Sequence, residues 1–303
     1  MKSLYRFFHL DITRGIWQIL KKTAIARFSG QTEQMRQKLL VKEFAKCSLN
    51  SQEKAFRISD MGFKMYSQFE EDGIILFILS VVGIKHYKLV EIGIGNGSEN
   101  MSSNLILNHG FNAWLFDGSS RNVRLAKVFF KLNSFIGLKQ PHLIKSWVTA
   151  ENIDNLLKQS GISGEIDILS IDVDGNDLYI WESIETVRPR ICIIETADFI
   201  PSSLSLSSPY DPLFNVWKKP KQIRDFRSAS LLAMNNLAKK KGYRLIGSNK
   251  RGFNAIYLRN DIGVIEFPEV SIELVHDNKW TKDGQAKRWP KVKDCEWVTI
   301  SYR

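Results

Sequence analysis

The chain has 303 residues, of which 44% are hydrophobic and 11% aromatic, and a formal net charge of +11. This composition is ordinary for a globular protein with a sizeable core, and it excludes collagen-like, fibrous and wholly disordered chains. The positive charge bears on partners rather than on fold, and it suits acidic substrates, an anionic membrane surface or nucleic acid.

The first sixty residues are expected to form a basic, helical extension. Between residues 4 and 28, apolar side chains recur mostly at spacings of three and four, which predicts an amphipathic helix. Such a helix could lie on an anionic membrane, pack on a partner or dock onto its own domain. The apolar run over residues 16–20 is far shorter than the roughly 20 residues that span a bilayer, and no secretory cleavage pattern follows it. We therefore expect a cytoplasmic protein, for which peripheral contact with the inner membrane face is one role of the helix.

From about Tyr66 onward, apolar strands alternate with helices. The expected strands cover residues 88–94, 113–117, 142–148, 166–173, 190–195, 243–247 and 254–258, and the expected helices cover residues 31–48, 101–109, 121–132, 151–160, 177–184 and 229–241. Repeated strand–helix units predict an α/β fold with a Rossmann-like, doubly wound sheet of seven strands, mostly parallel. The last two strands are joined too tightly for a parallel crossover, so the last strand should run antiparallel. We expect this domain to span residues 61–265, between the extension of residues 1–60 and a C-terminal extension of residues 266–303 packed on the domain.

A glycine-rich turn follows the first expected strand, in the order Glu91-Ile-Gly93-Ile-Gly95-Asn-Gly97. Alternate glycines permit a tight turn with backbone N–H groups near a ligand, and ligands of open parallel sheets lie beyond the carboxyl ends of the strands. The even spacing differs from the G-x-G-x-x-G of dinucleotide folds, and no Gly-Lys-Ser/Thr follows, which excludes a Walker loop. Glu91 could meet the amino group of a methionine-type ligand; an ordinary glycine-rich turn is the alternative.

Acidic residues end three further strands. Asp117 ends the second strand, where a carboxylate can bind both ribose hydroxyls of a nucleoside or merely begin a turn. The fourth strand leads into Asp172, Asp174 and Asp177, and crowded carboxylates raise one another's proton affinity unless a cation or donors compensate. They are candidates for a general base or for metal ligands, although Asp177 is more simply a first-turn acid or cap of the next helix. Glu195 ends the fifth strand and should project to the same edge as Asp172.

Together these segments resemble the FkbM-type class I S-adenosylmethionine-dependent methyltransferases. The resemblance runs from about Tyr66 to Asp261 and is carried by residues 66–74, 90–100, 167–181, 192–195 and 254–259. It implies O-methylation with S-adenosyl-L-methionine as cofactor, often on sugars of surface polysaccharides or on secondary metabolites. It also implies cofactor contact by Gln68, Glu91, Gly93, Gly95, Asp117 and Asp172, and an active-site role for Asp174. The run Thr196-Ala197-Asp198 departs from the Tyr-Asn-Ala-like run of the family, which leaves the substrate side open.

A methyltransferase must align the acceptor with the methyl group and remove a proton from the acceptor hydroxyl. We expect Asp174 to be the base, with Glu195 as the next candidate. An alternative gives Asp172 and Glu195 a divalent metal ion that acidifies the acceptor hydroxyl. Two rival functions use the same fold: an NAD-dependent sugar-modifying enzyme, which the even glycine spacing disfavours, and a non-catalytic binding protein.

The acceptor is predicted to be a small molecule or a glycan, and the lysines of residues 196–227 suit an acidic one. Tyr210, Phe214 and Trp217 in that segment could stack on sugar rings, so the segment is either an acceptor lid or a loop packed on its own core. No zinc-finger spacing or RNA-binding strand motif accompanies the basic clusters, so nucleic acid is the least favoured partner.

Overall fold

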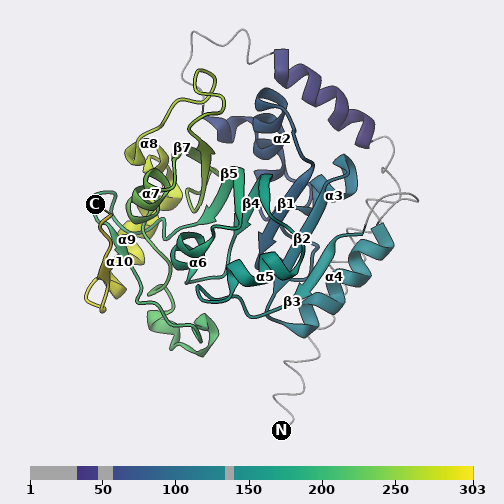
Figure 1. Cartoon of the computed structure of the whole chain (residues 1–303). Coiled ribbons are helices and arrows are strands. Elements are labelled where there is room, and N and C mark those ends of the chain that lie inside the picture. The colour runs from purple at the N-terminus through teal and green to yellow at the C-terminus, as the bar shows by residue number, and fades with distance from the viewer. Residues whose placement is uncertain (1–32, 47–56, 134–139, 303) are drawn as a thin grey trace.

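The computed structural model describes residues 33–46, 57–133 and 140–302 (Figure 1). The amphipathic helix expected over residues 4–28 lies outside these ranges. A helix is present over residues 33–46, within the helical region expected for residues 31–48. It packs on the main domain through Phe44, whose ring meets that of Phe77 edge-on at 5.3 Å, and through Gln34, which donates to the Leu107 carbonyl oxygen at 3.0 Å.

The centre of the molecule is a seven-stranded sheet in the order β3-β2-β1-β4-β5-β8-β7. The pairings of β3, β2, β1, β4 and β5 are all parallel, whereas β8 runs antiparallel to both β5 and β7. This confirms the mostly parallel, Rossmann-like sheet and the antiparallel last strand. The strands are β1 (Lys88–Ile92), β2 (Asn112–Asp117), β3 (His142–Lys145), β4 (Gly164–Ile171), β5 (Val187–Glu195), β7 (Tyr243–Ser248) and β8 (Asn254–Arg259).

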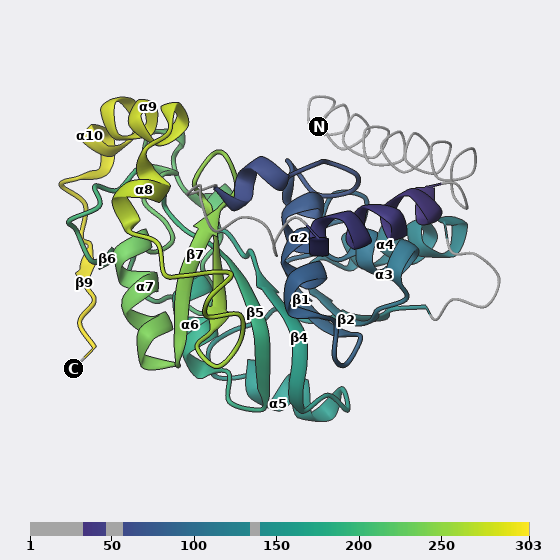
Figure 2. The ribbon, with the colours of Figure 1, turned by 90° about the horizontal axis from the view of Figure 1, so that it is seen from above.

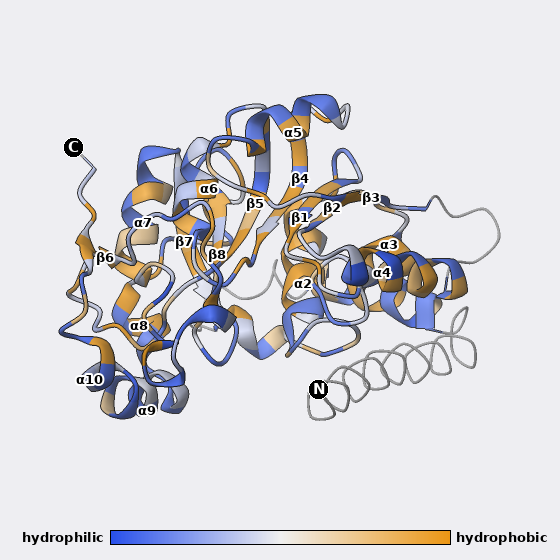
Figure 3. Ribbon diagram, turned by 90° about the horizontal axis from the view of Figure 1, so that it is seen from below, coloured by the Kyte–Doolittle hydropathy of each residue, from blue (hydrophilic) through white to orange (hydrophobic). Residues whose placement is uncertain are grey.

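Helices cover both faces of this sheet (Figure 2). One face packs on α5 (Ile153–Gln159), α6 (Asp177–Ser183) and α7 (Leu231–Lys240), and the other on α2 (Glu71–Val82), α3 (Ser103–His109) and α4 (Ser120–Asn133). Successive strand residues point to opposite faces, so Val90 and Leu169 join the first core, and Leu89 and Ile168 the second. Because both faces of the sheet are covered, the last six residues of β4 are all buried, and hydrophobic residues lie along the central strands (Figure 3).

Three local features differ from the expectations. Helix α2 was not expected, because its sequence is almost wholly apolar and therefore lacks the alternation of an amphipathic helix. Strand β3 ends at Lys145, so residues 146–148 leave the sheet. Helix α5 begins at Ile153 rather than at residue 151, and the Thr149 carbonyl oxygen accepts the backbone N–H groups of Asn152 and Ile153 in front of it.

The C-terminal residues attach to the segment that follows β5. Strand β9 (Val298–Thr299) pairs antiparallel with β6 (Leu206–Ser207), and Val292 joins a small core with Phe199 and Ile200. The remaining elements are the short helices η1 (Ile58–Met61), η2 (Val216–Lys218), η3 (Lys221–Ile223), α8 (Ile272–His276), α9 (Lys279–Lys287) and α10 (Trp289–Val292). Among the described residues, no helix combines the length and the apolar character that crossing a bilayer requires.

A buried ion pair fixes the amino-terminal edge of the sheet. Asp167 on β4 lies 3.1 Å from Arg190 on β5. Asp167 also accepts the backbone N–H groups of Lys85 and His86 at 2.9 Å and 2.8 Å, and Arg190 donates to the Val82 carbonyl oxygen at 2.8 Å. The pair therefore ties the connection between α2 and β1 to the middle of the sheet.

Asp167→Ala should lower the free energy of unfolding by about 3–5 kcal/mol, because it leaves Arg190 buried without its counter-charge. Urea unfolding followed by circular dichroism measures this loss. Asp283→Ala removes an exposed carboxylate that, within the described ranges, pairs with Lys287 alone, and it should change stability by less than about 0.5 kcal/mol. Equal effects of the two substitutions would contradict the role given to the buried pair.

Candidate functional site

The predicted site residues gather at the carboxyl edge of the sheet. Glu91 lies in β1 and Gly93 directly follows it, Asp117 ends β2, Asp172 directly follows β4, and Glu195 ends β5. Parallel strands bring these ends to the same edge, where ligands of open α/β sheets bind.

The glycine turn depends on the absence of side chains. Gly93, Gly95 and Gly97 have φ angles of +93°, +57° and +79°, in the left-handed region that glycine adopts readily. At Gly93 a Cβ atom would lie 1.7 Å from the Asp172 carbonyl oxygen, whereas at Gly95 it would meet nothing within 4 Å. Gly93 is therefore required by close packing against the end of β4, and Gly95 by backbone conformation alone.

Glu91 lies buried beneath this turn. Its carboxylate accepts the backbone N–H groups of Met101 and Ser102, both at 3.0 Å, and the Ser102 hydroxyl. Burial raises the pKa of Glu91, although these hydrogen bonds oppose the rise. Glu91 also lines a cavity of about 180 Å³ together with Gln68, Gly93, Glu99 and Asp172.

Gln68 is brought to this cavity by the segment in front of α2. The Asp72 carboxylate accepts the backbone N–H groups of Met65, Tyr66 and Ser67 at 2.6–2.7 Å, which bends the segment over the start of the helix. The bend leaves the Gln68 side chain exposed at the rim of the cavity.

Asp117 faces a second, larger cavity of about 410 Å³. Its carboxylate accepts the backbone N–H groups of Gly95 at 2.9 Å and Ser119 at 2.7 Å, so it also holds the glycine turn in place. Burial raises the pKa of Asp117, against the effect of these hydrogen bonds. The apolar walls of the cavity are formed within residues 146–148 and 214–217, by Trp147, Val148, Phe214, Val216 and Trp217. Gly93 and Asp172 line both cavities, which therefore meet between the ends of β1 and β4.

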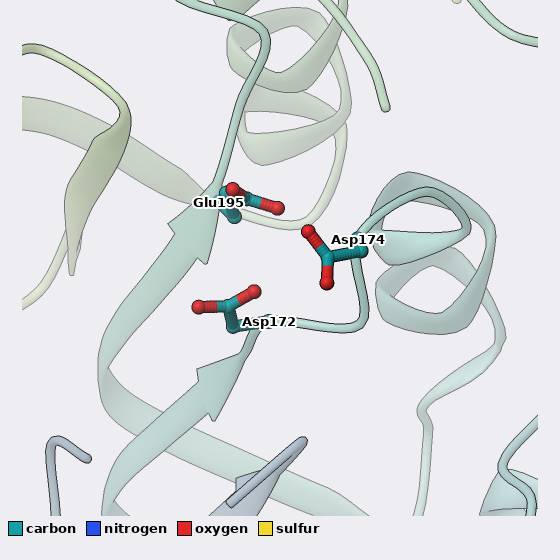
Figure 4. Close-up of side chains that lie close together, drawn as sticks. All are labelled: Asp172, Asp174 and Glu195. Atoms are coloured by element: carbon teal, nitrogen blue, oxygen red, sulfur yellow. The ribbon is translucent and has the colours of Figure 1, made fainter. Parts of the chain in front are cut away.

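Three carboxylates converge beside this meeting point (Figure 4). One oxygen atom from each of Asp172, Asp174 and Glu195 lies within 4.8 Å of the other two. Burial, followed by the charges of the neighbouring carboxylates, raises the pKa of Asp172 and of Glu195 well above their ordinary values. Asp174 has a φ angle of +60°, and such backbone strain in a residue other than glycine is concentrated at functional sites.

Arg227 partly balances the charge of this cluster. Its guanidinium forms an ion pair with Asp174, and although burial acts to lower the pKa of Arg227, Glu195 and Asp174 raise it. In contrast, the buried Oε2 atom of Glu195 has no hydrogen-bond partner in the part of the chain that the structure describes. Three carboxylate oxygens are suitable ligands for a hard divalent cation, but the arginine already supplies one positive charge to them.

Asp177 has the structural role expected of a first-turn acid. It begins α6, and its carboxylate accepts the backbone N–H groups of Val173 at 2.8 Å and Gly175 at 3.0 Å. Burial, and then the charge of Glu195, raise the pKa of Asp177 to about 7. These two hydrogen bonds hold the turn that carries Asp174.

Sequence patterns did not indicate Arg227 or the position of residues 209–217. That segment was expected to be either an acceptor lid or a loop packed on its own core, and the structure places Phe214 and Trp217 in the lining of the larger cavity with Asp117. It is held there by Asn176, which donates to the Asp211 carbonyl oxygen at 2.7 Å, and by Trp147, which donates to that of Pro212 at 2.8 Å. The aromatic residues of the segment indicated that it could cover a ligand, but the sequence could not show which cavity the segment lines.

Comparison with protein-family models found no match, and neither did comparison with curated protein sequences. Among solved structures, the chain is similar to an S-adenosylmethionine-dependent methyltransferase from Clostridium acetobutylicum, with 13% identity over 59% of this chain and 86% of that one, at a TM-score of 0.37. It is also similar to a chain of the fibrillarin/Nop5p complex, with 12% identity over 68% of this chain and 99% of that one, at a TM-score of 0.34. At this similarity neither structure bears on the chemistry of the site.

Alanine substitutions at Gly93 and Gly95 should lower the free energy of unfolding by different amounts. Gly95→Ala should lower the free energy of unfolding by about 1–2 kcal/mol, the cost of a left-handed conformation with a side chain. Gly93→Ala should cost a further 1–3 kcal/mol or so, because its methyl group displaces the end of β4. Urea unfolding of both variants measures the difference, and equal costs would contradict the close packing of Gly93 on Asp172.

Proposed function

We propose that this chain is an S-adenosylmethionine-dependent O-methyltransferase of the FkbM type that acts on a sugar hydroxyl of a glycan or glycan precursor. The observation that carries the proposal is the pair of cavities that meet at Gly93 and Asp172, with Asp117 in the larger and Glu91 in the smaller. The Rossmann-like sheet agrees with the fold that the sequence resemblance implies.

The two cavities suit the two halves of the cofactor. Asp117 would hold the ribose hydroxyls, while residues 146–148 and 214–217 offer apolar walls to the adenine ring. Glu91 and Glu99 give the smaller cavity the negative charge that an ammonium group requires. When bound, the cofactor supplies an activated methyl group on a sulfonium, and the acidic residues at the meeting point favour that positive charge.

Glu195 is a better candidate than Asp174 for the base that takes the proton of the acceptor hydroxyl. Asp174 is occupied by its ion pair with Arg227, whereas Glu195 Oε2 lacks a hydrogen-bond partner among the described residues. The raised pKa of Glu195 also makes its carboxylate a stronger base than an ordinary glutamate. Arg227 would then offset the charge of Asp174 and limit the repulsion within the cluster.

A divalent metal on Asp172 and Glu195 remains the alternative way to activate the hydroxyl. Those residues offer suitable oxygen ligands, but Arg227 neutralises part of the charge that would attract a cation. The metal-free mechanism is therefore the one we propose.

Cofactor binding is the first test. Calorimetry should show binding of S-adenosylmethionine and S-adenosylhomocysteine but not of NAD. Asp117→Asn should weaken binding about tenfold or more, because the amide loses one acceptor for the ribose hydroxyls and a charge-assisted hydrogen bond. Asp283→Asn, on the exposed face of α9, is the matched control and should leave affinity unchanged. Tight binding of NAD, or of neither ligand, would refute the proposal.

The pH dependence of turnover tests the base. A carboxyl must be ionised to accept a proton, so kcat should rise with pH through the raised pKa of Glu195, well above the ordinary range of glutamate. The pH dependence of kcat also reflects the charges that act on Glu195, which are those of Asp172, Asp174, Asp177 and Arg227. Glu195→Gln should lower kcat by about 10²–10⁴-fold and abolish the acidic limb, with cofactor affinity retained.

Asp174→Asn is the matched variant within the same cluster. It should reduce kcat less than Glu195→Gln does and keep the acidic limb. The opposite ranking would identify Asp174 as the base. Loss of activity in the wild-type chain after treatment with EDTA, restored by Mg²⁺, would favour the metal mechanism instead.

A further inference from the structure

Arg251 lies between two aromatic rings at the surface of the molecule. Its guanidinium carbon is 3.8 Å from the centre of the Phe69 ring and 4.2 Å from that of the Trp280 ring. Stacking uses the two faces of a guanidinium and leaves the N–H groups along its edge available. No residue in the described ranges forms a hydrogen bond or an ion pair with the Arg251 side chain. Among the residues that the structure describes, the stacked guanidinium of Arg251 therefore offers donors for which there is no acceptor.

The three residues of this sandwich come from distant parts of the chain that are anchored to each other. The Thr281 hydroxyl donates to the Arg251 carbonyl oxygen at 3.3 Å. A Cβ atom at Gly252 would lie 2.7 Å from the same hydroxyl, so α9 packs directly on the β7–β8 turn. Trp280 is thus held beside Arg251 in advance, which reduces the entropy that a ligand must overcome on binding.

The sandwich borders the acceptor side of the site. The Phe69 ring contacts that of Phe253 at 5.5 Å, and the Phe253 carbonyl oxygen accepts the Thr196 N–H at 2.7 Å, next to Glu195. Residue 68, which lines the smaller cavity, precedes Phe69 in the chain. None of the three sandwich residues lines the larger cavity, in which the nucleoside is placed.

Charge then indicates what the sandwich binds. In the described part of the chain, the cluster of Asp172, Asp174 and Glu195 forms an ion pair with one arginine, Arg227, so its excess negative charge repels an anionic acceptor. A negative group on the acceptor must lie away from that cluster, and Arg251, with Lys250 exposed beside it, offers the place. Trp280, which is 45% exposed, presents an apolar surface on which a sugar ring can lie.

We propose that Phe69, Arg251 and Trp280 form an acceptor subsite for an anionic sugar, whose carboxylate or phosphate is bound by the Arg251 fork. The inference rests on the proposed methyltransferase function and names the chemical class of its acceptor. A bidentate arginine contact selects planar carboxylates and phosphates over neutral hydroxyls.

Calorimetric titrations of the full chain, with and without S-adenosylhomocysteine, test the subsite. The probes are triglucuronate, glucose 6-phosphate and the neutral maltotriose. At least one of the two anionic probes, the carboxylate or the phosphate, should bind at least about tenfold more tightly than maltotriose. Arg251→Gln should remove this preference, and Arg251→Lys should restore only part of it, because lysine keeps the charge without the fork or the stacking. Lys221→Gln, an exposed basic position outside the sandwich, is the matched control and should bind as the wild type does.

The outcomes separate this inference from the proposed function. Equal binding of maltotriose and the anionic probes, or unchanged anionic binding in Arg251→Gln, overturns the subsite even if S-adenosylhomocysteine binds. Failure of S-adenosylhomocysteine to bind, with Arg251-dependent sugar binding retained, overturns methyl transfer but leaves an anionic-sugar site. Unchanged S-adenosylhomocysteine affinity in Arg251→Gln shows that the variant is folded.

Discussion

The contact between Gly93 and the backbone of Asp172 is the constraint on which the site depends. There is no space for a Cβ atom at this position, since it would lie 1.7 Å from the Asp172 carbonyl oxygen. Because β1 and β4 are neighbours in the sheet, this contact brings the first turn directly against the acidic end of the fourth strand. The two cavities meet there, since Gly93 and Asp172 line both of them, so a side chain at residue 93 would displace the wall that the cavities share.

Buried carboxylates hold the loops around this contact. Asp72, Glu91, Asp117 and Asp177 each accept two or more backbone N–H groups, and each replaces backbone acceptors that the turns cannot provide. Burial raises the pKa of all four. Glu195 differs from them, because among the described residues no backbone N–H group donates to its carboxylate, and its Oε2 atom has no hydrogen-bond partner. The first four acids therefore hold loops through backbone hydrogen bonds, whereas the carboxylate of Glu195 does not.

The sequence predicted the sheet well because alternating strands and helices, and the short β7–β8 connection, leave few arrangements open. Helix α2 escaped prediction since an almost wholly apolar helix lacks a polar face to reveal its period. The acids at the strand ends could be expected to share an edge, whereas Arg227 could not be placed there, because a single arginine in a polar segment carries no pattern. The position of Phe214 and Trp217 depends on hydrogen bonds from Trp147 and Asn176 that span 35–65 residues, beyond the reach of local periodicity.

The reversed direction of β8 has a further consequence for the two proposed sites. The parallel strands end at the functional edge, but β8 begins there, with Asn254 opposite Glu195. The hairpin that joins β7 to β8 is therefore delivered to the same edge, carrying Arg251 with it. Under the proposed function, a change in the length or sequence of that hairpin alters the acceptor subsite and leaves the cofactor site between β1, β2 and β4 in place. A single reversed strand thus puts the two proposed sites on separate connections of one sheet.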